Sequence, residues 1–172
     1  MRPNFVAVET FENVRREDIM FRKFSGVDTW HPRGGGNVRF GIYLPDDLAN
    51  ALDKKGWKIN WTRVDEDNPV ARAYLVVTLI YDKGFDPVVT GICDSSVESL
   101  TKDNISTLDT KDITTLTFRV RPWVKNNVKY QDEGAPAYLV AMNVYYKEDI
   151  MKRQVREALE KLEAEDDEAA PF

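Results

Sequence analysis

The segment Val38-Arg-Phe-Gly-Ile-Tyr-Leu44 alternates between apolar residues and small or polar ones. Alternation with a period of two predicts a β-strand that turns one face toward a core. Phe40 and Ile42 share that apolar face, and Arg39 lies on the opposite one. The segment 71–81 is apolar on both faces, which is typical of a strand in the centre of a sheet. These two segments predict a fold built on a β-sheet.

Short strand-like segments fill most of the chain around these two. A helix is predicted from Asp46 to about Lys55, because Pro45 favours its start and Gly56 ends it. The polar segment 94–111 is ambiguous, and we expect one helical turn and a loop there. So many short strands with so few helices predict a mainly β domain, either a barrel or a sandwich. The remaining strands are predicted at 17–24, 57–64, 88–93, 113–124 and 137–146.

The C-terminal part differs in composition from this β-rich body, which we take as one domain over residues 1–147. Residues 148–162 are predicted to form a helix whose apolar stripe packs on the body, with a partner or self-association helix as the alternative. Residues 163–172 hold five acidic side chains and no basic one, so they predict a disordered acidic tail. The apolar stripe comprises Met151, Val155, Leu159 and Leu162.

Charge is distributed unevenly along the chain. It holds 24 basic and 29 acidic side chains, a net charge of −5, and the five acids of residues 163–172 account for the whole excess. Residues 1–162 are therefore neutral overall, and a neutral body does not by itself indicate nucleic-acid binding. A basic surface has to come from local arrangement.

The sequence argues against several classes of protein. Cys93 and His31 are the only cysteine and the only histidine, which excludes an intramolecular disulfide and a Cys/His zinc site. The apolar context of Cys93 favours a small buried side chain. No apolar stretch has the length of a signal peptide or a membrane span. We therefore expect no membrane association and a cytoplasmic location, in the host cell if the protein is viral.

Catalytic motifs are absent from the sequence. It contains no Ser-His-Asp or Walker signature, and the glycines 34–36 lack the Gly-Lys-Ser/Thr ending of a phosphate-binding loop. We therefore expect no enzymatic activity, no cofactor and no metal site. A metal-dependent nuclease built from acidic residues scattered through the chain is the alternative.

The last residues combine a cluster of acids with an aromatic ring. Phe172 behind such a cluster suits a hydrophobic pocket ringed by basic side chains on a partner protein. This ending resembles the acidic tip of bacterial and phage single-stranded DNA-binding proteins. An ordinary solubilising tail is the alternative. The residues expected to bind a partner are Asp166, Asp167, Glu168, Pro171 and Phe172.

Segments of the body resemble a group of phage proteins assigned to the same class. The resemblance implies an OB-fold-like antiparallel barrel that coats single-stranded DNA (ssDNA) with little sequence preference and recruits replication or recombination proteins through the tail. A protein-interaction or virion structural β-domain with a solubilising tail is the alternative, and a homodimer is one option for assembly. The resemblance rests on Phe21-Arg-Lys-Phe-Ser-Gly26, Asn37-Val-Arg-Phe-Gly-Ile-Tyr-Leu44, Lys54-Lys-Gly-Trp-Lys-Ile-Asn60, Arg119-Val-Arg-Pro-Trp123 and Ala137-Tyr-Leu-Val-Ala-Met142.

Basic and aromatic side chains on the non-core side of the strands have the chemistry for this ligand. Single strands are bound by rings that stack on bases and by cations that follow the phosphates. Trp123 is the strongest stacking candidate, because two arginines precede it on the same strand face. Trp57 and Trp61 share a face with Ile59 and are expected in the core. The candidate ssDNA contacts are Trp30, Arg33, Arg39, Tyr43, Lys54, Lys55, Lys58, Arg72, Tyr74, Arg119, Arg121 and Trp123.

Overall fold

The computed structural model describes residues 8–26, 32, 36–94, 96–122, 134–147 and 150–169, and in the last range it describes the side chains of 154–164. Most of the elements are strands, so the prediction of a mainly β fold is confirmed. Two short 3-10 helices are labelled η1 and η2. In chain order the elements are β1 (Glu9–Arg15), η1 (Arg16–Asp18), β2 (Ile19–Lys23), β3 (Val38–Leu44), α1 (Asp46–Lys54), β4 (Asn60–Trp61), β5 (Ala73–Leu79), β6 (Val88–Cys93), β7 (Ser96–Leu100), η2 (Ile105–Asp109), β8 (Asp112–Pro122), β9 (Ala137–Lys147) and α2 (Ile150–Ala169).

The described strands form one mixed sheet in which β5 and β9 each pair with three other strands. The main strand order is β1-β8-β9-β5-β3-β2, β4 pairs with β5, and the β6–β7 hairpin joins the sheet through β9. The β5–β9 and β6–β9 pairs are parallel, and the other pairs are antiparallel. The predicted antiparallel arrangement therefore holds for most pairs but not for these two. The connections from β5 and β6 to β9 are long enough for the crossover that parallel strands require.

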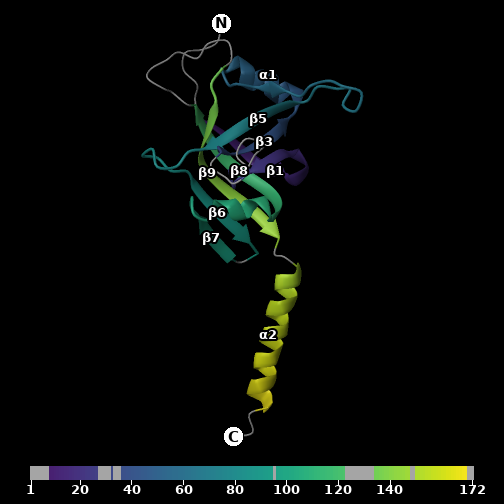
Figure 1. The fold of residues 1–172 in the computed structure, drawn as a ribbon, viewed down its shortest axis with the longest axis vertical. Coiled ribbons are helices and arrows are strands. Elements are labelled where there is room, and N and C mark those ends of the chain that lie inside the picture. Colours follow the sequence, from purple (N-terminus) through teal and green to yellow (C-terminus); the bar gives the residue numbers. More distant parts are fainter. Residues whose placement is uncertain are drawn as a thin grey trace.

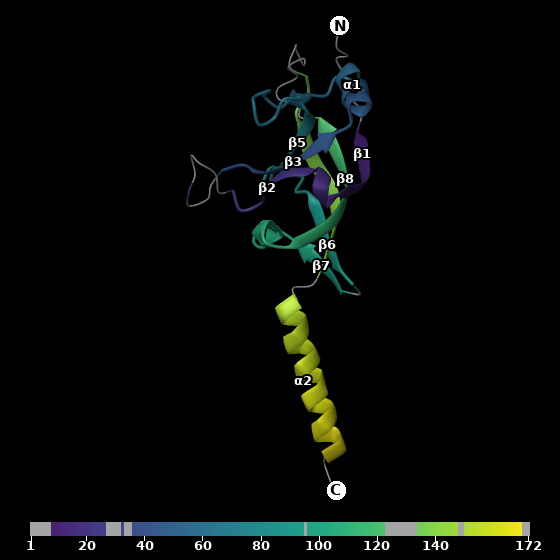
Figure 2. The same ribbon diagram turned by 90° about the vertical axis from the view of Figure 1, so that its right-hand side faces the viewer.

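The sheet curves around a core, with α1 at one end of the body and the β6–β7 hairpin at the other (Figures 1 and 2). Phenylalanine rings connect strands that are far apart in the strand order. Phe40 of β3 lies edge-on to Phe118 of β8, with 5.2 Å between the ring centroids, and Phe118 stacks on Phe11 of β1 at 5.1 Å. The two ends of the sheet thus share one core. Among the described strands β1 and β2 are not paired with each other, so a closed barrel is not confirmed.

The strongest sequence patterns also predicted the element boundaries. β3 and β6 begin and end as expected, and α1, β5, β8 and β9 do so within two residues. β1 was missed, because Asn13 has a positive φ of 53° and a register shift between Phe11 and Val14 interrupts the alternation. The predicted strand 17–24 divides into η1 and β2, and the ambiguous segment 94–111 contains β7 and η2.

The predicted strand 57–64 is reduced to the two residues of β4. Trp57 forms an isolated bridge with Ala135 and is 1% exposed, so its prediction as a core residue is confirmed. Trp61 is 45% exposed, so the same prediction for Trp61 is wrong. The two tryptophans belong to different pairings, because Trp57 bridges to Ala135 whereas Trp61 pairs with β5. The period-two alternation of a single strand therefore does not extend from Trp57 to Trp61, and the two side chains need not share a face.

α2 leaves the body beside the β6–β7 hairpin and extends away from it (Figures 1 and 2). The exposed fractions of Val155, Leu159 and Leu162 are 59%, 56% and 56%, so the predicted packing of this stripe on the body is wrong. The helix also continues past its predicted end at 162 to Ala169, and the tail expected to be disordered from 163 is helical up to that residue. Glu and Ala, which are frequent in this stretch, are strong helix formers.

Within the described residues, no helix is both long enough and apolar enough to cross a membrane.

Candidate nucleic-acid interface

The outward faces of β3 and β5 carry aromatic and polar side chains that alternate with the core. Arg39 and Tyr43 are partly exposed on β3, whereas Phe40, Ile42 and Leu44 are buried. Tyr74 and Thr78 have the same pattern on β5. The register places Tyr43 opposite Tyr74, and Arg39 opposite Thr78. The structure therefore brings together Arg39, Tyr43 and Tyr74 on one outward surface, as their strand parity predicted.

Five outward residues on five neighbouring strands lie opposite one another and form a row across the sheet. Lys23 of β2 is opposite Arg39 of β3, which is opposite Thr78 of β5. Thr78 is opposite Tyr138 of β9, which is opposite Arg121 of β8. All five side chains are partly exposed. We call this set the cross-strand row. With about 4.8 Å between neighbouring strands it spans roughly 19 Å.

Phe21 lies beside this row and was missed by the sequence analysis. The ring covers Gly41 of β3 so closely that a Cβ atom built on Gly41 would lie 2.5 Å from a ring carbon. The Lys23 ammonium and the Arg39 guanidinium lie 5.6 and 5.8 Å from the centroid of the same ring. The strand parity of β2, which puts Phe21 and Lys23 on one side, was the signal that could have found it.

Arg39 holds an unused hydrogen-bond donor. Its Nε is buried, and no acceptor for it is found among the described residues. The contact with the Phe21 ring fixes the guanidinium without satisfying this donor. The Arg39 side chain as a whole is partly exposed, so a phosphate or base oxygen that binds its guanidinium would gain a charge-assisted hydrogen bond.

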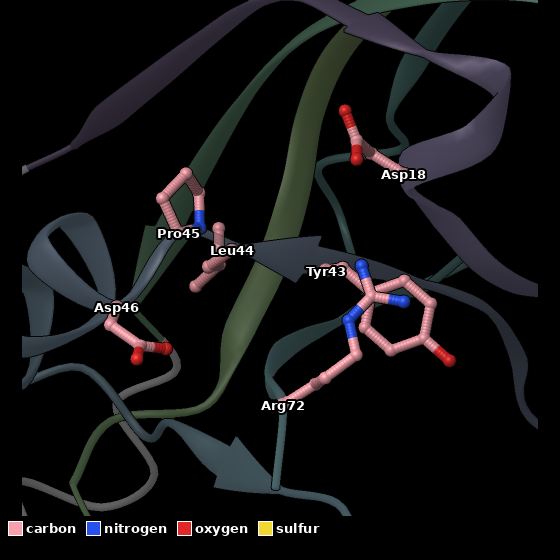
Figure 3. Close-up of a pocket in the computed structure, with 6 residues that line it drawn as sticks. All are labelled: Asp18, Tyr43, Leu44, Pro45, Asp46 and Arg72. Carbon is pink, nitrogen blue, oxygen red and sulfur yellow. The ribbon is translucent and has the colours of Figure 1, made fainter. Parts of the chain in front are cut away.

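Tyr43 and Arg72 form a stacked pair at one end of the interface, beside a pocket of about 280 Å³ (Figure 3). The guanidinium carbon of Arg72 lies 3.6 Å from the centroid of the Tyr43 ring. Asp18 and Asp46 also line the pocket. Their carboxylates oppose an anionic ligand, so the pocket suits the ring of a base better than a phosphate group.

Arg121 and Arg119 extend the outward surface onto β8. Burial raises the pKa of the Tyr138 phenol, while the nearby positive charge of Arg121 acts in the opposite direction. Arg119 has the same strand parity as Arg121 and is exposed, opposite Ala141 of β9. It lies next to the cross-strand row and not within it.

None of the three predicted lysines belongs to the cross-strand row. Lys54 ends α1 and Lys55 follows it. The Lys55 ammonium lies 3.1 Å from a carboxylate oxygen of Glu9 on β1, so an ion pair already occupies it. The Lys58 backbone N–H donates to the carbonyl oxygen of Ala135, and the Lys58 side chain is partly exposed.

Several predicted contacts lie outside the described residues. They are Trp30 and Arg33 in the segment that precedes β3, Trp123 after β8, and Pro171 and Phe172 after α2. Asp166, Asp167 and Glu168 belong to the last turns of α2, in the part whose side chains the structure does not describe.

One arginine beside the row has a structural role instead. The Arg22 Nη1 donates to the carbonyl oxygens of Leu108 and Lys111, at 3.1 and 2.7 Å. The Asp109 carboxylate accepts hydrogen bonds from the backbone N–H groups of Phe24 and Ser25, at 2.8 and 2.9 Å. These four bonds attach η2 to the end of β2.

The sequence of the whole chain was compared with models of known protein families. The model of a family described as "Putative phage ssDNA-binding domain" matches residues 5–168, nearly the whole chain. The chain belongs to this family. Comparisons with curated proteins and with solved structures gave no match.

Membership of the phage ssDNA-binding domain family confirms the resemblance that the sequence motifs carried. It also gives ssDNA as the ligand class of the domain. Among the described residues of this chain, no group of three or more His, Cys, Asp or Glu side chains could hold a metal ion.

Proposed function

We propose that the protein coats and protects ssDNA with little sequence preference, and that the strand crosses the sheet along the cross-strand row. The observation that carries this proposal is the register that aligns Lys23, Arg39, Thr78, Tyr138 and Arg121 on five strands. Cations at the two sides of the row suit phosphates, and the Tyr138 ring between them suits a base.

Four aromatic rings, those of Phe21, Tyr43, Tyr74 and Tyr138, belong to this surface. Phe21 lies on β2 with Lys23, and Tyr74 lies on β5 with Thr78. Every base has a face that can stack on a ring, so such a surface accepts any sequence. This supports binding with little sequence preference.

We further propose that the fold is an OB-fold-like barrel. β1 and β2 follow each other in the chain, separated by η1, and pair with β8 and β3 respectively. Taken as two halves of one bent strand, they would join both ends of the order β8-β9-β5-β3. The phenylalanine contacts between β1, β8 and β3 support this arrangement.

The acidic C-terminal segment is proposed to recruit replication or recombination proteins through Asp166, Asp167, Glu168, Pro171 and Phe172. Clustered acids steer a basic partner, and an aromatic ring can anchor in its pocket. Phe172→Ala keeps every charge, so it should abolish capture of such proteins from an infected-cell extract and leave ssDNA affinity unchanged. Equal capture by both forms would reduce the segment to a solubilising role.

The test of ssDNA binding is a titration of labelled oligo-dT and of duplex DNA of the same length. We expect much tighter binding of the single strand, with affinity that falls as salt rises because phosphate contacts release counterions. Equal affinity for duplex, or no binding at low salt, would overturn the proposal. Such a result would favour a protein-interaction or virion structural domain, an alternative that the neutral charge of the body supports.

A further inference from the structure

α2 carries an apolar stripe that no described part of the chain covers. Val155, Leu159 and Leu162 are each more than half exposed, at 59%, 56% and 56%. They recur at helical spacing on one side of a helix that extends away from the body (Figure 2). An uncovered stripe of this kind marks a contact surface.

The charges along α2 run in the order that destabilises a lone helix. Lys152, Arg153 and Arg156 are the charged residues of the first two turns, and the last turns hold acids without a base. The N-terminus of a helix carries a partial positive charge and its C-terminus a partial negative one, so each end of α2 repels its own side chains. A lone helix gains stability from the opposite order.

An antiparallel copy of the same helix removes both problems. The basic half of each helix then lies beside the acidic half of the other, and the two helix dipoles oppose each other. A two-fold axis near Leu159 brings residues 152–156 of one helix beside 162–166 of its partner. The same axis brings the described part of the stripe, Val155 to Leu162, beside its own copy, because Leu159 lies near the centre of that part.

We propose that α2 pairs with the α2 of a second copy of the chain, antiparallel, through the stripe Val155, Leu159 and Leu162. This goes beyond the proposed function and does not depend on DNA. A parallel pair would instead place acids beside acids over the last turns, which is unfavourable. A helix of 20 residues is about 30 Å long, so the two bodies lie at opposite ends of the pair.

The test uses charge reversal in the full-length chain at low salt, with sedimentation equilibrium over a wide concentration range. Lys152→Glu with Arg153→Glu reverses two of the three basic residues near the start of α2, and Glu165→Lys with Asp166→Lys reverses two of the five acids near its end. We expect wild type to dimerise as its concentration rises. Each variant alone should have a dimer dissociation constant at least about tenfold higher. An equimolar mixture of the two variants should form a heterodimer.

The controls separate loss of pairing from loss of structure. Both variants improve the charge order of a lone helix, so circular dichroism should show α2 retained or increased while dimerisation falls. Glu66→Lys with Asp67→Lys makes the same charge change in the exposed turn before β5 and should leave the dimer intact. Leu159→Ala with Leu162→Ala should also weaken the dimer.

Three results would overturn the antiparallel pair. The first is wild type that stays monomeric at the highest concentrations. The second is that the Lys152→Glu, Arg153→Glu variant forms a heterodimer with wild type more readily than with the Glu165→Lys, Asp166→Lys variant. That result indicates a parallel pair. The third is loss of the monomer's thermal stability in the Leu159→Ala, Leu162→Ala variant, which indicates that the stripe covers the body. A failure of the chain to bind oligo-dT would overturn the proposed function but would not change the outcome of any of these dimerisation and stability measurements.

Discussion

Two arginines on neighbouring strands show how differently one side-chain type is used. Arg22 and Arg39 point to opposite sides of the sheet. The Arg22 Nη1 donates hydrogen bonds to the carbonyl oxygens of Leu108 and Lys111. Arg39 rests on the Phe21 ring with a buried Nε that has no acceptor among the described residues. The first arrangement is complete without a ligand, and the second is not.

Arg39→Ala and Arg22→Ala should therefore have opposite effects. We expect Arg39→Ala to lower oligo-dT affinity about tenfold or more, because a charge-assisted bond is worth about 1.5–3 kcal/mol, and to leave the melting temperature nearly unchanged. Its salt slope should fall by about 0.7 if one phosphate contact is lost. Arg22→Ala should instead destabilise the fold by about 1–3 kcal/mol, since two carbonyls lose their donor. Thermal unfolding and fluorescence titration of both variants distinguish the roles, and a reversal of the two effects would contradict them.

Tyr81, which follows β5, carries a buried hydroxyl for which the described residues offer no partner. Burial, with a further contribution from the negative charge of Asp86, raises the pKa of Tyr81 from 10.0 to about 12. The folded state thus keeps this proton at a pH where the unfolded state has lost it. Wild type should lose stability as pH rises from about 10 to about 12, and the contribution is fully present below pH 10.

Tyr81→Phe removes this titration and the unpaired hydroxyl together. We expect it to be neutral or slightly stabilising at pH 7, and to flatten the alkaline loss of stability measured by urea unfolding between pH 9 and about pH 11.5. Parallel pH profiles for the two proteins would show that Tyr81 is solvated.

Strand parity placed Arg39, Tyr43 and Tyr74 on the outward faces of β3 and β5, because these two strands pair without a register shift. It failed at Trp61, where the chain changes its pairing partner between Trp57 and β4. The parity of β2 could have placed Phe21 on the outward side with Lys23. It could not have shown the contact of Phe21 with Gly41, because a pattern along one strand does not reveal contacts between strands.

At the scale of elements, β2 and β3 are joined by that same contact. A Cβ atom on Gly41 would lie 2.5 Å from the Phe21 ring. Gly41→Ala should therefore displace the ring and cost about 1–3 kcal/mol in the free energy of unfolding. In a Phe21→Ala background the same change should cost much less, because no ring remains to be displaced. Urea unfolding of the four proteins in this double-mutant cycle measures the coupling. Equal costs in both backgrounds would contradict the contact.

Local patterns identified most elements but not how they pair. β9 is predicted as a strand at Ala137, yet nothing in its sequence indicates parallel neighbours on β5 and β6. β7 was missed because its residues are exposed apart from Leu100. The cross-strand row depends on these pairings, so the sequence supplied its members Arg39 and Arg121 without showing that they align.

At the scale of the whole molecule, the body and the C-terminal segment differ in charge. The residues after Lys147 hold nine of the 29 acidic side chains and four of the 24 basic ones, so residues 1–147 keep 20 of each. The whole excess of negative charge thus lies after Lys147, where α2 extends away from the body. Removing that helix should change affinity more than stability.

Truncation after Lys147 should leave the urea midpoint within the equivalent of about 0.5 kcal/mol, because the stripe of α2 covers no described core residue. We expect tighter binding of an oligo-dT short enough for one body, most visibly at low salt where repulsion is least screened. Added salt is the internal control, since it should remove the difference. A clear loss of stability would mean that α2 packs on the body in solution.

The pairing of β1 with β8 also orders events during synthesis. The Asn13 N–H donates to the Thr117 hydroxyl, 104 residues further along the chain. A ribosome adding about 5–20 residues per second needs roughly 5–20 s to cover that distance, and β8 is the only described strand that pairs with β1. Throughout that interval the backbone of β1 has no native partner and is open to pairing with other nascent chains. The first described strand to leave the ribosome is therefore among the last to be incorporated into the sheet.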